Sequence, residues 1–214
     1  MKAITSFLVG AAMTFAAASA SAEVIYTDNT YRDFDASSGL VTFDVTTHGL
    51  ISDLNIAVEF SKCDNPFIDP QGSACVGRDT PYEDEIVMRL IGPDGRVLSL
   101  IEKGTFDEGD TPGIGRILLT FTDESATLGK RVQAGAFRPL EALSAFDGMD
   151  MFGQWQLYFE DTRGMDPLEV FSSSLIFNGQ EAPPADVPEP ASLAVFGIGL
   201  AALGALRRRQ RRQA

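Results

Sequence analysis

The chain has 214 residues, of which 30 are acidic and 17 basic, so its formal net charge is −13. All the acidic residues lie between positions 23 and 189, where only 11 basic residues accompany them, and the charge of this body is therefore 11 minus 30, or −19. Such an acidic surface repels nucleic acid and anionic lipid headgroups, and we exclude nucleic-acid binding.

Residues 1–22 have the order of a cleavable signal peptide. A basic start at Met1-Lys2 precedes an apolar run over residues 7–18 and four small residues, and the acidic Glu23 follows. We predict cleavage between Ala22 and Glu23 by a signal peptidase, with a retained N-terminal anchor as the alternative. The mature protein then begins at Glu23.

The body, residues 23–180, is long enough for one domain and is patterned as short strands. Its strand candidates alternate apolar and polar residues and are rich in β-branched ones, and Gly92-Pro-Asp-Gly95 is a turn that makes Met88–Leu100 a hairpin. The pattern predicts an all-β, jelly-roll-like β-sandwich. The candidates are residues 40–46, 54–60, 86–91, 96–101, 117–122, 155–160 and 170–177.

Two long connections interrupt these strands. Residues 61–85 hold the only cysteines, Cys63 and Cys75, and export would place them in an oxidising space where an isolated pair usually forms a disulfide. Two free buried thiols are the alternative. Residues 123–153 form a connection too long to lie unstructured in a compact domain, and we expect it to pack on the sheet.

The C-terminal region divides into three parts. Residues 181–190 are a Pro-rich linker, residues 191–206 are uncharged, and residues 207–214 are a basic tail. Sixteen residues make a helix of about 24 Å, short for a bilayer core of about 30 Å but able to span it if the membrane thins. We predict a transmembrane helix with a cytoplasmic tail, and a core helix of the domain is the alternative. The tail arginines are Arg207, Arg208, Arg209, Arg211 and Arg212.

The motif Val187-Pro188-Glu189-Pro190, the apolar helix and the arginine cluster together resemble the PEP-CTERM sorting signal of Gram-negative bacteria. The resemblance implies an exosortase as processing partner and transient membrane anchoring through the helix. It also implies delivery to the cell surface or to the extracellular exopolysaccharide matrix. A permanent tail anchor is the alternative.

The body also resembles the P domain (P/Homo B) that follows the catalytic domain of proprotein convertases. The stretches that carry the resemblance are residues 121–126, 137–140, 143–148, 153–157, Asp161 and 175–177, with weaker matches at residues 53–56 and 90–95. Ala142 stands where the family has proline, Asp166-Pro167 where it usually has Gly-Asp, and the 61–85 insertion is unusual. The resemblance implies a jelly roll that is not itself catalytic.

The residues themselves offer little catalytic chemistry. His48 is the only histidine, no G-x-S-x-G motif occurs, and we expect His48 to be a hydrogen-bonded residue at a strand end rather than a base. We therefore expect no enzymatic activity. Trp155 is expected in the core, with Leu157 and Phe159 on the same face of the strand, and a sugar-stacking platform is its alternative.

Calcium is the cofactor for which the sequence offers candidates. Hard cations take several carboxylate and carbonyl oxygens, and the loops flanking the tryptophan strand are rich in aspartate. These loops could converge at one end of the sandwich, although no EF-hand spacing is present. A solvated acidic surface is the alternative. The candidates are Asp147, Asp150, Asp161 and Asp166.

Three functions from different classes fit this sequence. The first is an exported, non-catalytic structural or adhesive component of the surface or matrix. The second is a carbohydrate-binding module for exopolysaccharide, which would show an exposed aromatic patch. The third is an accessory chaperone or inhibitor of an exported subtilisin-like protease, an idea that rests on fold-level analogy.

Overall fold

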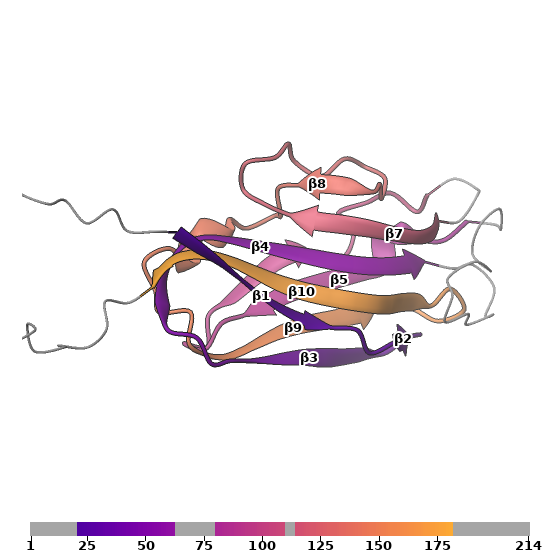
Figure 1. The fold of residues 1–214 in the computed structure, drawn as a ribbon. Helices are drawn as coiled ribbons and strands as arrows, with labels where there is room; N and C mark the ends of the chain where they lie inside the picture. The colour runs from indigo at the N-terminus through magenta and orange to yellow at the C-terminus, as the bar shows by residue number, and fades with distance from the viewer. Residues whose placement is uncertain (1–20, 63–79, 110–113, 182–214) are drawn as a thin grey trace, which may run out of the picture.

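In the computed structural model, residues 21–62, 80–109 and 114–181 are described, and they form two β-sheets that pack face to face (Figure 1). The larger sheet has the strand order β1-β10-β4-β7-β8, with β2 also paired to β10, and the smaller has the order β3-β9-β5-β6. The strands are β1 (Ser21–Asp28), β2 (Arg32–Phe34), β3 (Ser38–Val45), β4 (Gly49–Lys62), β5 (Ile86–Ile91), β6 (Val97–Ile101), β7 (Ile114–Phe121), β8 (Gly135–Phe137), β9 (Gly153–Asp161) and β10 (Leu168–Glu181). Two 3-10 turns are η1 (Glu83–Glu85) and η2 (Leu143–Phe146). The all-β prediction is confirmed.

The core lies between the sheets and is built by the period-two alternation of the strands. On β9, Trp155, Leu157 and Phe159 are all buried, as predicted from their shared face. The Trp155 indole Nε1–H donates to the Met151 carbonyl oxygen at 2.8 Å, so its one polar atom is satisfied. Its ring meets those of Phe146 and Phe177 edge-on, with centroids 4.8 and 5.3 Å away. Trp155 is therefore a core residue and no sugar platform.

The predicted hairpin is confirmed. Strands β5 and β6 pair antiparallel from Met88↔Ile101 to Ile91↔Val97. The Gly95 N–H donates to the Gly92 carbonyl at 3.0 Å, and Gly95 takes a φ of 83°, which glycine adopts without steric cost.

The long connection between β7 and β9 packs on the sandwich, as predicted. Strand β8 pairs parallel with β7, and η2 buries Phe146 against Trp155. The Asp123 carboxylate accepts hydrogen bonds from the backbone N–H groups of Leu143 and Ser144, at 3.0 and 2.8 Å. This carboxylate ties the end of β7 to η2.

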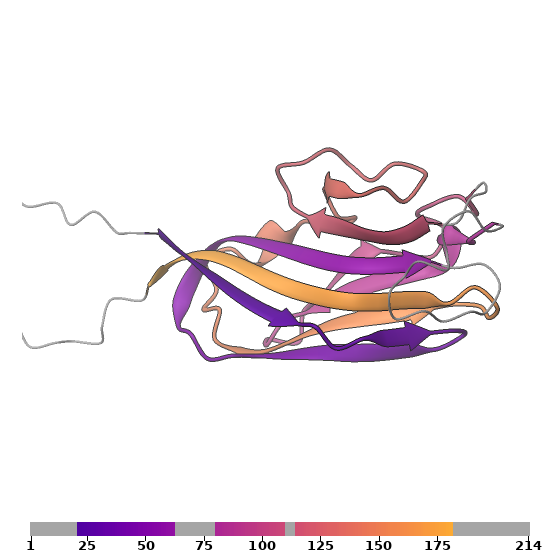
Figure 2. The same cartoon turned by 45° about the vertical axis from the view of Figure 1, so that its right-hand side comes forward.

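Three strands escaped the sequence analysis: the eight-residue β1 and the three-residue β2 and β8. Strand β1 pairs with β10 over its whole length, from Ser21↔Gln180 to Asp28↔Ser173. The predicted cleavage site, Ala22–Glu23, therefore falls within β1. Because β1 starts where β10 ends, the chain enters and leaves the sandwich at the same end (Figure 2).

Several predictions concern residues outside the described ranges. These are residues 1–20 of the predicted signal peptide (1–22), Cys63 and Cys75, residues 182–190 of the predicted linker (181–190), the uncharged segment 191–206 and the tail arginines. Among the residues that the structure describes, no helix is long and apolar enough to span a membrane.

Candidate functional site

Buried charge gathers at the end of the sandwich opposite the chain termini. At this end β4 finishes, β5 begins, and β9 turns into β10 (Figure 1). Burying a charge is costly unless it is paired, so such a concentration calls for a physical account. The buried charged residues in the described ranges are Lys62, Glu83, Glu85, Asp161, Asp166 and Glu169.

The centre of this cluster is the Lys62 ammonium, which is fully buried. Its Nζ lies 2.6 Å from Asp161 Oδ2, 3.0 Å from Asp166 Oδ2 and 3.5 Å from Glu85 Oε2. The ammonium also donates to the Asp166 backbone carbonyl. One cation is thus surrounded by three carboxyl groups, and we name these four residues the Lys62 cluster.

The alternation of the strands explains why the cluster is inside. On β4, Lys62 continues the inward face of Ile56, Val58 and Phe60, and on β9 Asp161 continues the inward face that begins at Trp155. Each apolar face thus ends in a charged residue, and the two charges meet across the gap between the sheets.

The electrostatics leave the cluster short of positive charge. Burial raises the pKa of Asp161, although the charge of Lys62 and a hydrogen bond from it act in the other direction. Burial also raises the pKa of Asp166 to about 7, against the attraction of Lys62 and with a further rise from its hydrogen bond with Glu85. With a pKa of about 7, Asp166 is protonated about half of the time at neutral pH, close to the amine.

The backbone around the cluster is strained. The described non-glycine residues with positive φ are Ala36 at 46°, Tyr82 at 46° and Met165 at 92°. Two hydrogen bonds hold the turn between β9 and β10. The Ala36 N–H donates to the Arg163 carbonyl at 2.9 Å, and the Met165 N–H donates to the Asp35 carboxylate at 2.7 Å. Strain of this kind persists only where surrounding contacts impose it, and here those contacts fix the loop that carries Asp166.

Other polar contacts enclose the cluster. Arg163 Nε lies 3.5 Å from Glu85 Oε1, and the Arg163 N–H donates to Asp161 Oδ1 at 3.1 Å. Beside them, the Ser61 hydroxyl and the Tyr31 hydroxyl each donate to Glu169, at 2.6 and 2.9 Å. Asp161 is therefore held through both of its oxygens, one facing an amine and the other a backbone N–H.

The four calcium candidates do not converge, and that part of the sequence prediction is wrong. Asp147 and Asp150 precede β9 while Asp161 and Asp166 end or follow it, and a strand of this length separates the two pairs by about 26 Å. Asp161 and Asp166 face the Lys62 ammonium instead. In the described ranges, no group of three or more His, Cys, Asp or Glu is arranged to hold a metal ion.

His48 lies at the other end of β9, beside Asp150. Its Nδ1 is 2.7 Å from Asp150 Oδ2, and its ring stacks on Phe152 with centroids 4.2 Å apart. The side chain of His48 is 58% exposed, so this hydrogen bond is solvated. The hydrogen-bonded position before β4 is the one that the sequence predicted.

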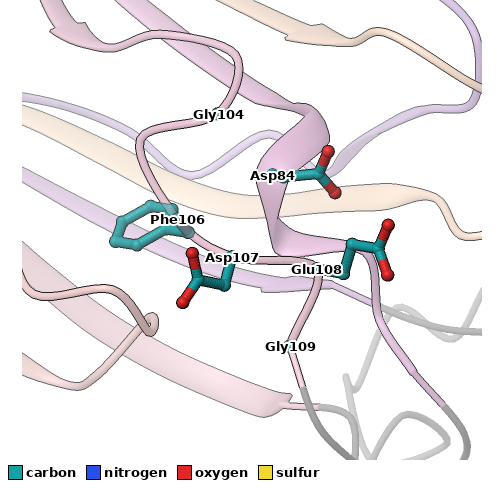
Figure 3. A pocket seen from close by; sticks show the side chains of 6 residues that line it. All are labelled: Asp84, Gly104, Phe106, Asp107, Glu108 and Gly109. Atoms are coloured by element: carbon teal, nitrogen blue, oxygen red, sulfur yellow. The ribbon is translucent and has the colours of Figure 1, made fainter.

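A second feature near the Lys62 cluster is an acidic hollow (Figure 3). Phe106 is buried beneath it, and Asp107 points to the opposite side from Asp84 and Glu108. The Asp107 carboxylate faces the exposed Lys130 ammonium at 4.0 Å. These carboxylates do not converge, and the hollow is a solvated acidic surface.

The C-terminal region matches a known family model. Residues 186–210 match the family model of the PEP-CTERM protein-sorting motif. This PEP-CTERM match covers Val187, Pro188, Glu189 and Pro190, the uncharged segment and the first tail arginines. It indicates recognition by an exosortase and sorting toward the surface. It covers only a small part of the chain and does not describe the sandwich.

Comparisons of the whole chain add little to this. No curated protein matches the sequence. The serine protease of Aeromonas sobria, solved in complex with the chaperone ORF2, is 12% identical, with a TM-score of 0.36 and coverage of 74% of this chain. This chain therefore spans only 27% of the protease chain. The structure of FLHE is 12% identical with a TM-score of 0.34, covering 74% of this chain and 97% of that one. At these TM-scores neither likeness carries an argument.

Sequence reasoning missed the Lys62 cluster, although a signal for it was present. Extending the apolar alternation by one step beyond Phe60 and beyond Phe159 places Lys62 and Asp161 in the interior. Glu85 and Asp166 carry no such signal, because a turn and a loop bring them to the cluster.

Proposed function

We propose that this chain is a non-catalytic, P-domain-like jelly-roll sandwich that serves as a structural or adhesive component of the cell surface or exopolysaccharide matrix. A signal peptide exports it, and the C-terminal segment 191–206 holds it in the inner membrane until an exosortase acts on the PEP-CTERM motif. The sandwich itself performs no turnover on a substrate.

The observation that carries this proposal is the sorting motif at residues 186–210, which begins a few residues after β10 ends at Glu181. Because β1 and β10 pair from Ser21↔Gln180 onward, the end of the sandwich that holds both termini faces the membrane while the chain is anchored. The opposite end, where β4 ends at Lys62 and β9 ends at Asp161, then faces away from the membrane. This arrangement supports a domain displayed on a tether.

The test follows the full chain in its producing bacterium, in the presence and absence of the exosortase gene. We expect a shortened, surface-released or matrix-associated protein in the first strain and a full-length, membrane-retained protein in the second. Glu189→Ala should reproduce the retention in the normal strain, whereas Pro183→Ala, which lies in the linker outside the matched motif, should not. Equal release in both strains would refute exosortase-dependent sorting.

The proposed structural role of this protein in the matrix has a separate test. Matrix prepared from a strain lacking this protein should be mechanically weaker or less cohesive than matrix from the parent strain, and the purified protein should show no hydrolytic activity toward peptides or glycans. Unchanged matrix, or measurable turnover, would contradict the proposed role without affecting the sorting result.

A further inference from the structure

The Lys62 cluster places an amine and a carboxyl group in contact inside a dry core. The side chains of Lys62 and Asp161 are both fully buried, and their Nζ and Oδ2 atoms are 2.6 Å apart. The two residues belong to different sheets, β4 and β9, and 98 residues lie between them in sequence. A bond between them would link the two layers of the sandwich.

We propose that Lys62 and Asp161 condense to an intramolecular isopeptide bond in the folded protein. The Lys62 nitrogen attacks Cγ of Asp161, the C–Oδ2 bond breaks, and Oδ2 leaves as water. The reaction neither oxidises nor reduces any atom. The nitrogen loses two protons as ammonium becomes amide, and the departing oxygen takes up two, so the proton balance closes within the cluster.

The surrounding residues supply what this step requires. Asp166 Oδ2 and Glu85 Oε2 lie 3.0 and 3.5 Å from the reacting nitrogen and can pass its protons to the leaving oxygen. Asp161 Oδ1 accepts the backbone N–H of Arg163 at 3.1 Å, and this donor stabilises the negative charge that develops on Oδ1 during attack. Asp166 and Glu85 thus act as a proton relay and the Arg163 N–H as an oxyanion donor.

Condensation of an amine with a carboxylic acid is unfavourable in bulk water, but the fold changes the balance. Holding two reacting groups in contact corresponds to effective molarities of about 10⁵–10⁸ M. Burial excludes the water that would hydrolyse the product. Burial also raises the pKa of Asp161, which favours the neutral carboxylic acid as the reacting form.

The bond also removes two buried charges from the cluster. A buried ion pair contributes little net stability because both ions must be desolvated. An amide removes the charges of Lys62 and Asp161 together. Asp161 Oδ1, which becomes the amide carbonyl oxygen, keeps the Arg163 N–H as its donor.

The experiment is peptide mass spectrometry of the full chain isolated from its producing cells, after denaturation, reduction and digestion with trypsin. An acylated Lys62 resists trypsin, and trypsin does not cut the Arg138-Pro139 bond. We therefore expect a branched product joining residues 33–78 to residues 132–163, lighter than the two peptides together by one water. Fragmentation should place the branch at Lys62 and Asp161.

Complete cleavage after Lys62, with linear peptides of calculated mass, would overturn the proposal. The exposed pair Lys130 and Asp107, at 4.0 Å, is an internal control and should give only linear peptides. Because the wild-type protein alone decides the question, a variant that fails to fold does not leave it open.

Three variants sharpen the test. Asp161→Asn can condense by releasing ammonia and should give a branched peptide identical in mass to that of the wild type, whereas Asp161→Ala should give none. Asp166→Asn together with Glu85→Gln should slow branching at least tenfold in freshly made protein, because the relay loses its acids. Unchanged branching in that double variant would refute the relay. This result is independent of whether the exosortase test succeeds.

Discussion

Trp155 is the residue on which a core role and a sugar-binding role make opposite predictions. It is fully buried, its indole N–H is satisfied by Met151, and two aromatic rings pack on it edge-on. Replacing a buried tryptophan by alanine costs about 3–5 kcal/mol, through lost transfer energy and the cavity left behind. Trp155→Phe keeps most of the packing but leaves the Met151 carbonyl without its donor, and should cost about 1–3 kcal/mol.

The assay is urea unfolding of the purified protein, followed by far-UV circular dichroism because Trp155 is the only tryptophan of the chain. With a slope of about 2 kcal/mol per molar urea, Trp155→Ala should lower the midpoint by about 2 M. Phe152→Ala is the matched control, since Phe152 is 48% exposed and its loss should cost about 1 kcal/mol or less. Equal midpoints for the two variants would refute the assignment of Trp155 to the core, and loss of glycan retention without loss of stability would restore the sugar-binding alternative.

Three further predictions concern the local structure. Burial raises the pKa of Glu83 above 4.5, so the folded state holds a proton that the unfolded chain releases, and stability falls as pH rises through and just above 4.5. Glu83→Gln should flatten this dependence in thermal unfolding scans between pH 4 and 7, while Glu108→Gln, on the exposed surface, should leave it unchanged. Asp123→Ala removes the acceptor of two backbone N–H groups and should lower the free energy of unfolding in urea by about 1–3 kcal/mol. Asp123→Asn should lose less, and equal losses for the two variants would contradict the hydrogen-bonding role of Asp123. Gly153→Ala places a Cβ 2.6 Å from Pro93 Cβ at a φ of 133° and should lower the free energy of unfolding by about 2–4 kcal/mol. In the control Gly148→Ala the added atom meets open space, and the loss should be about 1 kcal/mol. Equal losses would show that the contact with Pro93 is relieved.

The sequence predicted the fold class well because the body's longer strands alternate cleanly. Residues 54–60 and 155–160 show a period of two that leaves little choice between helix and strand, and both lie within observed strands, β4 and β9. Strands β2 and β8 have three residues each, too few for any period to appear. Strand β1 overlaps the end of the predicted signal peptide, and only its pairing with β10 identifies it.

The candidate site was less accessible to sequence reasoning, for two reasons. The aspartates on either side of β9 were expected together because they are close in sequence, but an extended strand carries its ends to opposite ends of a sandwich. Conversely, Lys62 and Asp161 meet although 98 residues separate them. Strand pairing and register decide such contacts, and local patterns do not encode them.

The position of the Lys62 cluster fits a domain that is held by its C-terminal end. A pull on the tail would load β10, which pairs with β4 along nearly its whole length, so force passes readily between these two strands of the larger sheet. Strand β9 belongs to the smaller sheet and is joined to β4 by side-chain packing and the Lys62–Asp161 ion pair, which separate more easily than a hydrogen-bonded ladder. A covalent bond between Lys62 and Asp161 would join the sheets at the end farthest from the tether. Opening of the sandwich at that end would then require breaking an amide rather than separating an ion pair.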